Sequence, residues 1–283
     1  MDLSSIVHKF DSSLISGSAK VKESDAILLD DLNELFNGKI NAIRIPNFFR
    51  EESEGNTGKI FSQEKSLECY NHEIKEGETI RYLDYGVDRF GVSFNTTYNG
   101  CSIAKDRYYN NALENIRNIR NIFGPKLSPF DRFRLELDEI WPGNVGIAKF
   151  EDRKMMSGIV RVMNRPNDSE LISAQPHIDI LPKKYSSLIG QFAVNIYLSV
   201  PEQGGFLELW DAPAVHAENC NEVSEGDWRS RLGKPTKIRP LTGDLILFNS
   251  RVPHAVSPFS GGPRVSIQSF IGLTSDGHLQ LWA

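Results

Sequence analysis

The hydrophobic pattern divides the chain into a front part with helical periodicity and a back part made of short strand-like runs. In the front part, segments 25–39, 105–125 and 128–143 place apolar residues three or four positions apart, which is typical of amphipathic helices. Segment 40–49 reads as a strand that Pro46 interrupts. The front part is therefore expected to be mostly helical.

Local signals mark the ends of these helices. Asp25 and Ser128 are expected to cap the first and third helices, with Pro129 at the first position of the third. Gly38 and Gly124 are expected to end the first and second helices. One apolar stripe is predicted along the second helix, made of Tyr109, Leu113, Ile116, Ile119 and Phe123.

The pattern of hydrophobic residues changes after Gly143. Short runs rich in β-branched and aromatic residues follow, separated by turn signals, at 146–150, 157–164, 174–181, 190–200, 205–211, 236–241, 243–249 and 264–273. This spacing indicates a mainly β fold with flanking helices, as a β-sandwich, jelly roll or barrel. We expect one domain, 1–283, with a mostly helical front part and edge strands over 1–142. A β core over 143–273 and a C-terminal tail over 274–283 complete it.

Composition narrows the function classes. The formal net charge of −5 and the pI of about 5.8 give no positive field for nucleic acid or an anionic membrane. No window approaches 18 consecutive apolar residues, and the N-terminus lacks the features of a secretory signal, so neither a membrane span nor secretion is expected. Three widely spaced cysteines suggest free thiols. The predicted setting is cytoplasmic, with a small molecule as substrate.

The stretch "SAQPHIDIL" carries the first candidate chemistry. If it is a strand, His177 and Asp179 point to the same face with Gln175 beside them, so both can meet one ion. A third ligand must come from elsewhere, and His254 is favoured because it follows the strand-like run "GDLILFN" at a fixed end. The other candidates are His8, His72, His216 and His278.

Two histidines and a carboxylate suit a non-haem Fe(II) site, although the same ligands also serve catalytic zinc. The run "RVSIQSFIGL" favours iron, because it places Arg264, Ser266 and Gln268 on one strand face. An inward guanidinium and hydroxyl need an anion, and arginine grips a carboxylate at two points. A dicarboxylate between the metal and Arg264 fits both features.

The order His177-x-Asp179, His254 and then Arg264-x-Ser266 resembles that of the Fe(II)/2-oxoglutarate-dependent dioxygenases over roughly residues 143–273. The flanking runs "NIYLSVPEQGGFLELW" and "LTGDLILFNSRVPHAVSP" are similar to the central strands of that family. The layout most resembles its small-molecule-tailoring enzymes, which modify natural products or free amino acids and include free-substrate halogenases.

This resemblance implies a double-stranded β-helix, a jelly roll like that of the cupins. It also implies Fe(II) on His177, Asp179 and His254, with 2-oxoglutarate anchored by Arg264 and Ser266 and O₂ as cosubstrate. The related halogenases have Gly or Ala where this chain has Asp179, so the resemblance implies hydroxylation of an unactivated C–H group, with succinate and CO₂ as coproducts.

The sequence allows two interpretations for the roles of several other residues. Asn195 either hydrogen-bonds 2-oxoglutarate or is a structural amide, and Arg161 either binds an acidic group of the substrate or forms an exterior salt bridge. Gln175 and Trp210 are further candidates for substrate contact. Segment 81–100 either lines the substrate cleft or packs as an ordinary loop, and the polar excursion 216–235 is either a lid or decoration.

The residues are also compatible with other functions. The same cofactors support desaturation or cyclisation as well as hydroxylation. A non-catalytic jelly roll that binds a ligand is a second class, but it has no need for this combination of ligands and arginine. A zinc hydrolase on a cupin-like barrel is a third class, and it would require a general base near the metal.

Overall fold

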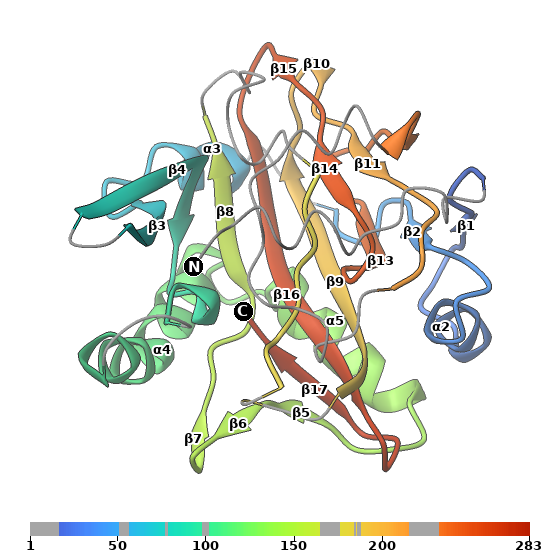
Figure 1. The fold of residues 1–283 in the computed structure, drawn as a ribbon, viewed down its shortest axis with the longest axis horizontal. Coiled ribbons are helices and arrows are strands. Elements are labelled where there is room, and N and C mark those ends of the chain that lie inside the picture. The colour runs from blue at the N-terminus through green and yellow to red at the C-terminus, as the bar shows by residue number, and fades with distance from the viewer. Residues whose placement is uncertain are drawn as a thin grey trace.

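The computed structural model describes residues 17–50, 57–76, 79–97, 102–164, 176–183, 185, 188–214 and 232–283. These residues form a mostly β protein with few helices (Figure 1). The helical elements are α2 (Leu29–Phe36), α3 (Thr57–Ser62), α4 (Ser102–Ile122) and α5 (Pro129–Ile140), together with the 3-10 turn η2 (Phe94–Thr97). No helix in this part of the chain is long and apolar enough to cross a membrane.

A large sheet of ten strands dominates the described residues. Its spatial order is β1 (Val21–Glu23), β2 (Ala42–Ile45), β13 (Leu245–Asn249), β9 (Leu188–Ser199), β16 (Arg264–Thr274), β8 (Ile159–Met163), β4 (Thr79–Phe90) and β3 (Glu68–Glu76). β17 (Leu279–Trp282) pairs with β16, and β5 (Val145–Ile147) pairs with β17. The predicted tail thus contributes a strand to the sheet.

A smaller sheet consists of β12 (Thr236–Ile238), β11 (Leu207–Leu209) and β14 (His254–Val256). In Figure 1, β11 and β14 lie in front of the large sheet, while α4 and α5 lie behind it. Two short pairs complete the strands: β10 (Gln203–Gly204) with β15 (Phe259–Ser260), and β6 (Lys149–Phe150) with β7 (Arg153–Lys154).

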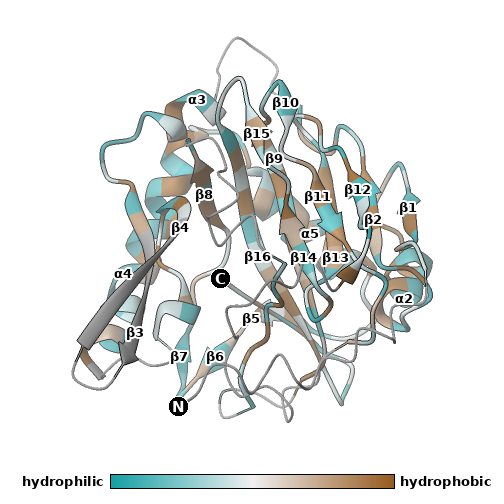
Figure 2. Cartoon of the chain, turned by 45° about the horizontal axis from the view of Figure 1, so that its top comes forward, coloured by the Kyte–Doolittle hydropathy of each residue, from teal (hydrophilic) through white to brown (hydrophobic). Residues whose placement is uncertain are grey.

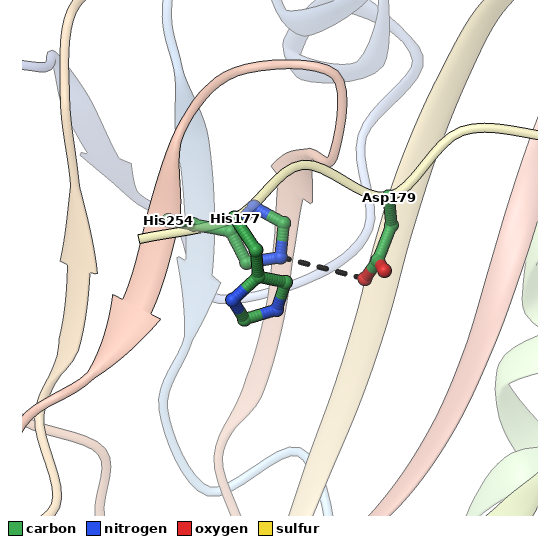
Figure 3. A group of neighbouring side chains, drawn as sticks. All are labelled: His177, Asp179 and His254. Atoms are coloured by element: carbon green, nitrogen blue, oxygen red, sulfur yellow. Dashed lines mark ion pairs between the residues drawn. The ribbon is translucent and has the colours of Figure 1, made fainter. Parts of the chain in front are cut away.

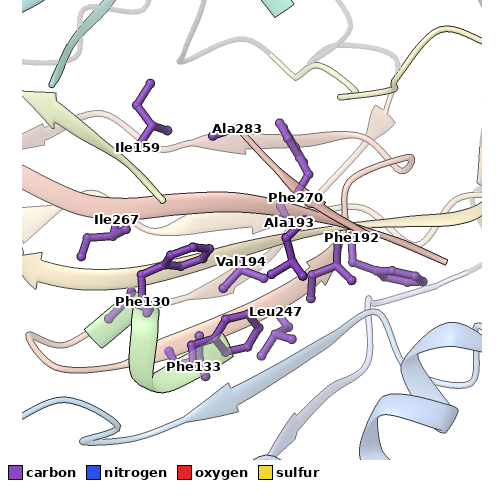
Figure 4. Packing of buried hydrophobic residues seen from close by; sticks show 14 of the residues in the cluster. Phe130, Phe133, Ile159, Phe192, Ala193, Val194, Leu247, Ile267, Phe270 and Ala283 are labelled. Carbon is purple, nitrogen blue, oxygen red and sulfur yellow. The ribbon is translucent and has the colours of Figure 1, made fainter. Parts of the chain in front are cut away.

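The two faces of the large sheet differ in chemistry. On one face Val194, Leu247 and Ile267 are fully buried and pack near Phe130 and Phe133 of α5 (Figure 4). The strands β8 and β13 are mostly hydrophobic in Figure 2 because both contribute to this core. The opposite face carries buried polar residues, among them Asn195, Arg264 and Ser266, and it faces the smaller sheet. The predicted site residues therefore lie between the two sheets.

Helix α5 begins as the sequence predicts. Ser128 is its N-cap, its hydroxyl accepts a hydrogen bond from the backbone N–H of Asp131 at 3.1 Å, and Pro129 occupies the first turn. The first helix is different, because α2 begins only at Leu29 and its N-cap position, Leu28, makes no side-chain cap bond. The prediction of Asp25 as its cap is therefore wrong.

Other expectations also change. Leu113 is 55% exposed, so it does not belong to the buried stripe of α4. The region 174–181 forms no continuous strand in its described part, which holds a single isolated bridge at His177. Strands β3 and β4 form a hairpin where the pattern predicted none, and β4 runs into segment 81–100. The excursion 216–235 lies mostly outside the described residues.

Candidate active site

The three predicted metal ligands lie together (Figure 3). His177 and His254 exchange backbone hydrogen bonds of 2.9 Å in each direction, and the backbone N–H of Asp179 donates to Ser250 O at 2.8 Å. Each of the three side chains offers a ligand atom, and these atoms all lie within 4.8 Å of one another. Two chain segments, 177–179 and 250–254, therefore present three ligands to one point.

The hydrogen bond of His254 fixes which nitrogen faces this point. Nδ1 lies 3.0 Å from the carbonyl oxygen of Val252. A carbonyl only accepts, so Nδ1 carries the proton and Nε2 keeps its lone pair when the ring is neutral. Nε2 lies 3.4 Å from Oδ2 of Asp179. A lone pair and a carboxylate oxygen that face each other require a cation or a proton between them. A metal-binding histidine has the same arrangement: one ring nitrogen faces the metal, and the other donates to a carbonyl or carboxylate, here the carbonyl of Val252.

Asp179 is held in its charged form. Burial on its own raises the pKa of this carboxyl group, but the neighbouring His254 and His177 and the charge of Arg161 lower the pKa well below its ordinary value. The carboxylate is thus ionised at neutral pH and ready to bind a cation. Two imidazoles and one carboxylate form a donor set that suits Fe(II) and leaves positions open for other ligands.

Arg264 supplies a buried positive charge on the same side of the large sheet. Its side chain lies over the Tyr197 ring, with Nη2 donating to Tyr197 Oη at 3.1 Å and Nε to Gly205 O at 3.3 Å. Within the described residues its hydrogen-bond partners include no carboxylate, and burial lowers the pKa of the guanidinium. A buried guanidinium of this kind favours an anionic ligand.

Strand pairing places the remaining predicted residues on the same face. Ser266 lies opposite Arg161 of β8 on one side and Tyr197 of β9 on the other, and Gln268 lies opposite Asn195. Opposed residues on neighbouring strands share a face, so these side chains form a polar surface beside Arg264. Ser266 and Asn195 are buried at 1% and 8% exposure.

Arg161 lies close enough to Asp179 for its charge to lower the pKa of that carboxyl group. A recess beside it is lined by Arg161, Gln268, Ser93 and Asn95, together with the apolar Ile159 and Phe270. The site therefore combines cationic, amide and hydrocarbon surface.

Trp210 and Gln175 are also predicted to contact the substrate. Trp210 is 1% exposed and packs with Leu232 and Ala255, and its Nε1 donates to Gly233 O at 3.0 Å. Trp210 therefore packs beside Ala255 rather than His254, and its substrate contact stays a prediction. Gln175 lies outside the described residues.

The other candidate histidines do not join the described site. The side chain of His278 lies near Asp276, and its Nδ1 accepts from Asn144 N at 3.1 Å. His8 and His216, and the side chain of His72, lie outside what the structure describes.

Sequence reasoning missed three residues that contact the site, namely Tyr197, Gln191 and Ser250. Tyr197 and Gln191 share a face of β9 with Asn195, so strand alternation from Asn195 is a signal that could have found both. Ser250 follows β13 and gave no comparable signal, because its contact with Asp179 spans 71 positions.

Comparisons with known proteins agree with this arrangement. Residues 171–272 match the model of the 2OG-Fe(II) oxygenase superfamily. L-gamma-glutamyl-L-propargylglycine hydroxylase from Streptantibioticus cattleyicolor is 24% identical over 275 residues, which cover 92% of this chain and 95% of the relative. An N-substituted L-amino acid dioxygenase from Burkholderia ambifaria, solved in complex with alpha-KG (2-oxoglutarate), has a TM-score of 0.58 at 13% identity, with 90% of both chains covered.

The chain carries a 2OG-Fe(II) oxygenase superfamily region over residues 171–272. It is a 2-oxoglutarate-dependent dioxygenase, with Fe(II) and 2-oxoglutarate as its cofactors.

Proposed function

We propose that this enzyme hydroxylates an unactivated C–H group of a small molecule, either a free amino acid or a natural-product intermediate. The observation that carries the proposal is the convergence of His177, Asp179 and His254 on one point, together with the buried guanidinium of Arg264. The two relatives named above act on amino acid derivatives, which supports the substrate class.

In this proposal His177, Asp179 and His254 hold Fe(II). The protonated Nδ1 of His254 donates to Val252 O, which orients the ring and leaves Nε2 for the metal. Because Asp179 stays ionised, the site needs no proton release from this carboxyl group before the metal binds.

Arg264 anchors the distal carboxylate of 2-oxoglutarate, and Ser266 and Asn195 are proposed as further contacts. The guanidinium is pre-oriented by Tyr197 Oη and Gly205 O, so little side-chain freedom is lost on binding. Both Ser266 and Asn195 lie on the same face of the sheet as Tyr197.

When bound, Fe(II) and 2-oxoglutarate supply O₂ activation coupled to oxidative decarboxylation, which yields succinate and CO₂. The residues of this chain bind and orient the two cofactors. Asp179 also favours hydroxylation over chlorination, since its carboxylate occupies the ligand position that is empty of protein ligand in the related halogenases.

Arg161 is proposed to bind an acidic group of the substrate. It stands on β8 directly opposite Ser266, next to the proposed 2-oxoglutarate position, and its charge reaches Asp179. Gln268 adjoins it in the same recess. A carboxylate held here would orient an amino acid derivative toward the metal.

The proposed core is a double-stranded β-helix within a single domain. In support, β2 of the front part pairs with β13 of the back part in the same sheet. The smaller sheet faces the larger one, and the bridge between His177 and His254 extends it.

The test measures succinate release by the metal-free protein after addition of Fe(II), 2-oxoglutarate and a panel of amino acids and their N-substituted or γ-glutamyl derivatives. A true substrate is expected to stimulate succinate formation and to gain one oxygen atom, detected by mass spectrometry. Asp179→Ala, checked for folding by circular dichroism, should remove this turnover.

Three outcomes would overturn the proposal: a wild-type enzyme that releases no succinate with iron, a product that is desaturated or cyclised without added oxygen, or an Asp179→Ala variant with full turnover. Hydrolysis of a substrate with Zn(II) and without 2-oxoglutarate would instead support a zinc hydrolase.

A further inference from the structure

The segment that carries Asp179 has little regular backbone pairing. His177 forms an isolated bridge with His254, and residues 178–181 belong to no described strand. A metal ligand must be held to within about 0.5 Å of its working position. Something other than a strand ladder therefore fixes the backbone of Asp179 relative to the two histidines.

Gln191 of β9 makes this connection. Its Nε2 donates to Asp179 O at 3.0 Å, and its Oε1 accepts from Leu181 N at 2.7 Å. The amide thus bonds on both sides of Ile180, replacing the two backbone bonds that a neighbouring strand would supply. Both ends of the amide are used, so only one orientation satisfies this donor and this acceptor.

Ser250, which follows the neighbouring strand β13, adds to this support. Its Oγ donates to Asp179 O at 3.1 Å, and its carbonyl oxygen accepts from Asp179 N at 2.8 Å. Gln191 and Ser250 are 2% and 0% exposed, so water does not compete for these bonds. Ser250 belongs to the turn that leads to His254, which ties the two ligand segments together.

We propose that Gln191 is a positioning residue for the metal centre, acting through the backbone of Asp179. The proposal rests on the proposed role of Asp179 as a metal ligand. Gln191 touches neither the metal position nor the substrate recess. It fixes the distance between the carboxylate and the two imidazoles, on which metal affinity depends.

Two variants test this role. Gln191→Met keeps the length of the side chain and removes both hydrogen bonds. Gln191→Glu keeps the acceptor for Leu181 N but places a carboxylate oxygen against Asp179 O. Ser269→Ala is the matched control, because it deletes another fully buried hydrogen bond, from Ser269 Oγ to Trp282 O at 2.9 Å, on the same sheet.

Metal affinity is measured by titrating Co(II) and, without oxygen, Fe(II) into metal-free protein in a calorimeter, with the Co(II) absorption spectrum as a second readout. Both Gln191 variants are expected to weaken metal binding by about 10- to 100-fold and to change the Co(II) spectrum. Ser269→Ala should keep the wild-type affinity and spectrum. Melting temperatures of the metal-free proteins show whether each variant folds.

Excess Fe(II) should restore much of the turnover of Gln191→Met but none of that of Asp179→Ala. A folded Gln191 variant whose metal affinity lies within about twofold of wild type would overturn the proposal. If Gln191→Met does not fold, the metal affinity of Gln191→Glu provides this test. If wild type binds metal and Asp179→Ala binds it equally well, the proposed function fails instead, so the two failures are distinguishable.

Discussion

Arg264→Met is expected to weaken 2-oxoglutarate binding strongly without destabilising the cofactor-free protein. The guanidinium is 6% exposed and finds hydroxyl, carbonyl and sulfur partners in place of a carboxylate. Arginine does not lose its proton in proteins, so the desolvation that lowers the pKa of Arg264 opposes folding at every working pH. Methionine fills much of the same volume without that charge.

The magnitude follows from the proposed contact. Removing one partner of a buried, hydrogen-bonded charge pair costs about 2–5 kcal/mol. Since about 1.4 kcal/mol corresponds to a factor of ten, the dissociation constant for 2-oxoglutarate should rise about 30- to 4,000-fold. Tyr197→Phe removes only the hydroxyl that orients the guanidinium, so a loss of about fivefold, from about 1 kcal/mol, is expected.

Calorimetric titration of 2-oxoglutarate into the Co(II)-loaded protein measures this change, and thermal unfolding of the metal-free protein measures stability. Arg153→Met, which removes a surface guanidinium paired with Asp106, is the matched control and should leave 2-oxoglutarate affinity unchanged. The reasoning is refuted if Arg264→Met binds 2-oxoglutarate within about threefold of wild type, or if its Co(II) affinity falls in parallel.

Further predictions concern the substrate, the metal and the helices. Arg161→Gln should raise KM by at least about tenfold for substrates with a free carboxylate; equal KM values for an acid and its amide in the wild type would contradict this role. Removing the metal with a chelator should abolish succinate release, and only Fe(II) among added divalent metals should restore it. Ser128→Ala should lower the free energy of unfolding by about 1 kcal/mol because α5 loses its cap, as urea denaturation would show. Burial raises the pKa of Asp131, but its bonds with Arg120 and Ser128 lower this pKa overall. The ion pair of Asp131 with Arg120 therefore stabilises the fold above pH about 4, and this contribution is lost as the pH falls. Asp131→Asn should therefore destabilise the protein by about 1 kcal/mol at pH 7 and by clearly less at pH 3, and an equal loss at both pH values would contradict the ion pair.

Features that depend on neighbouring residues were predictable from the pattern. The start of α5 follows from Ser128 and Pro129, because a cap and its partner lie within one turn of each other. The first helix shows the limit of this reasoning, since Asp25 has a suitable side chain but lies too far from the observed start at Leu29.

Pairing between distant segments was harder to predict. The strands β3 and β4 mix charged and apolar residues without the regular alternation that marks a strand, and Glu68 and Arg89, which lie opposite each other, form an ion pair. Their strand character comes from the partner segment and from the pairing of β4 with β8.

The sequence by itself determined the chemical types of the site and their order: two imidazoles and a carboxylate for a metal, then an inward arginine for an anion. These follow from side-chain chemistry and strand spacing, which are local properties. The tertiary structure decided how Asp179 is held, since its segment is not a strand and depends on Gln191 and Ser250. It also decided that Trp210 packs beside Ala255 rather than His254. Both outcomes depend on contacts between segments distant in sequence, which no local pattern of residues records.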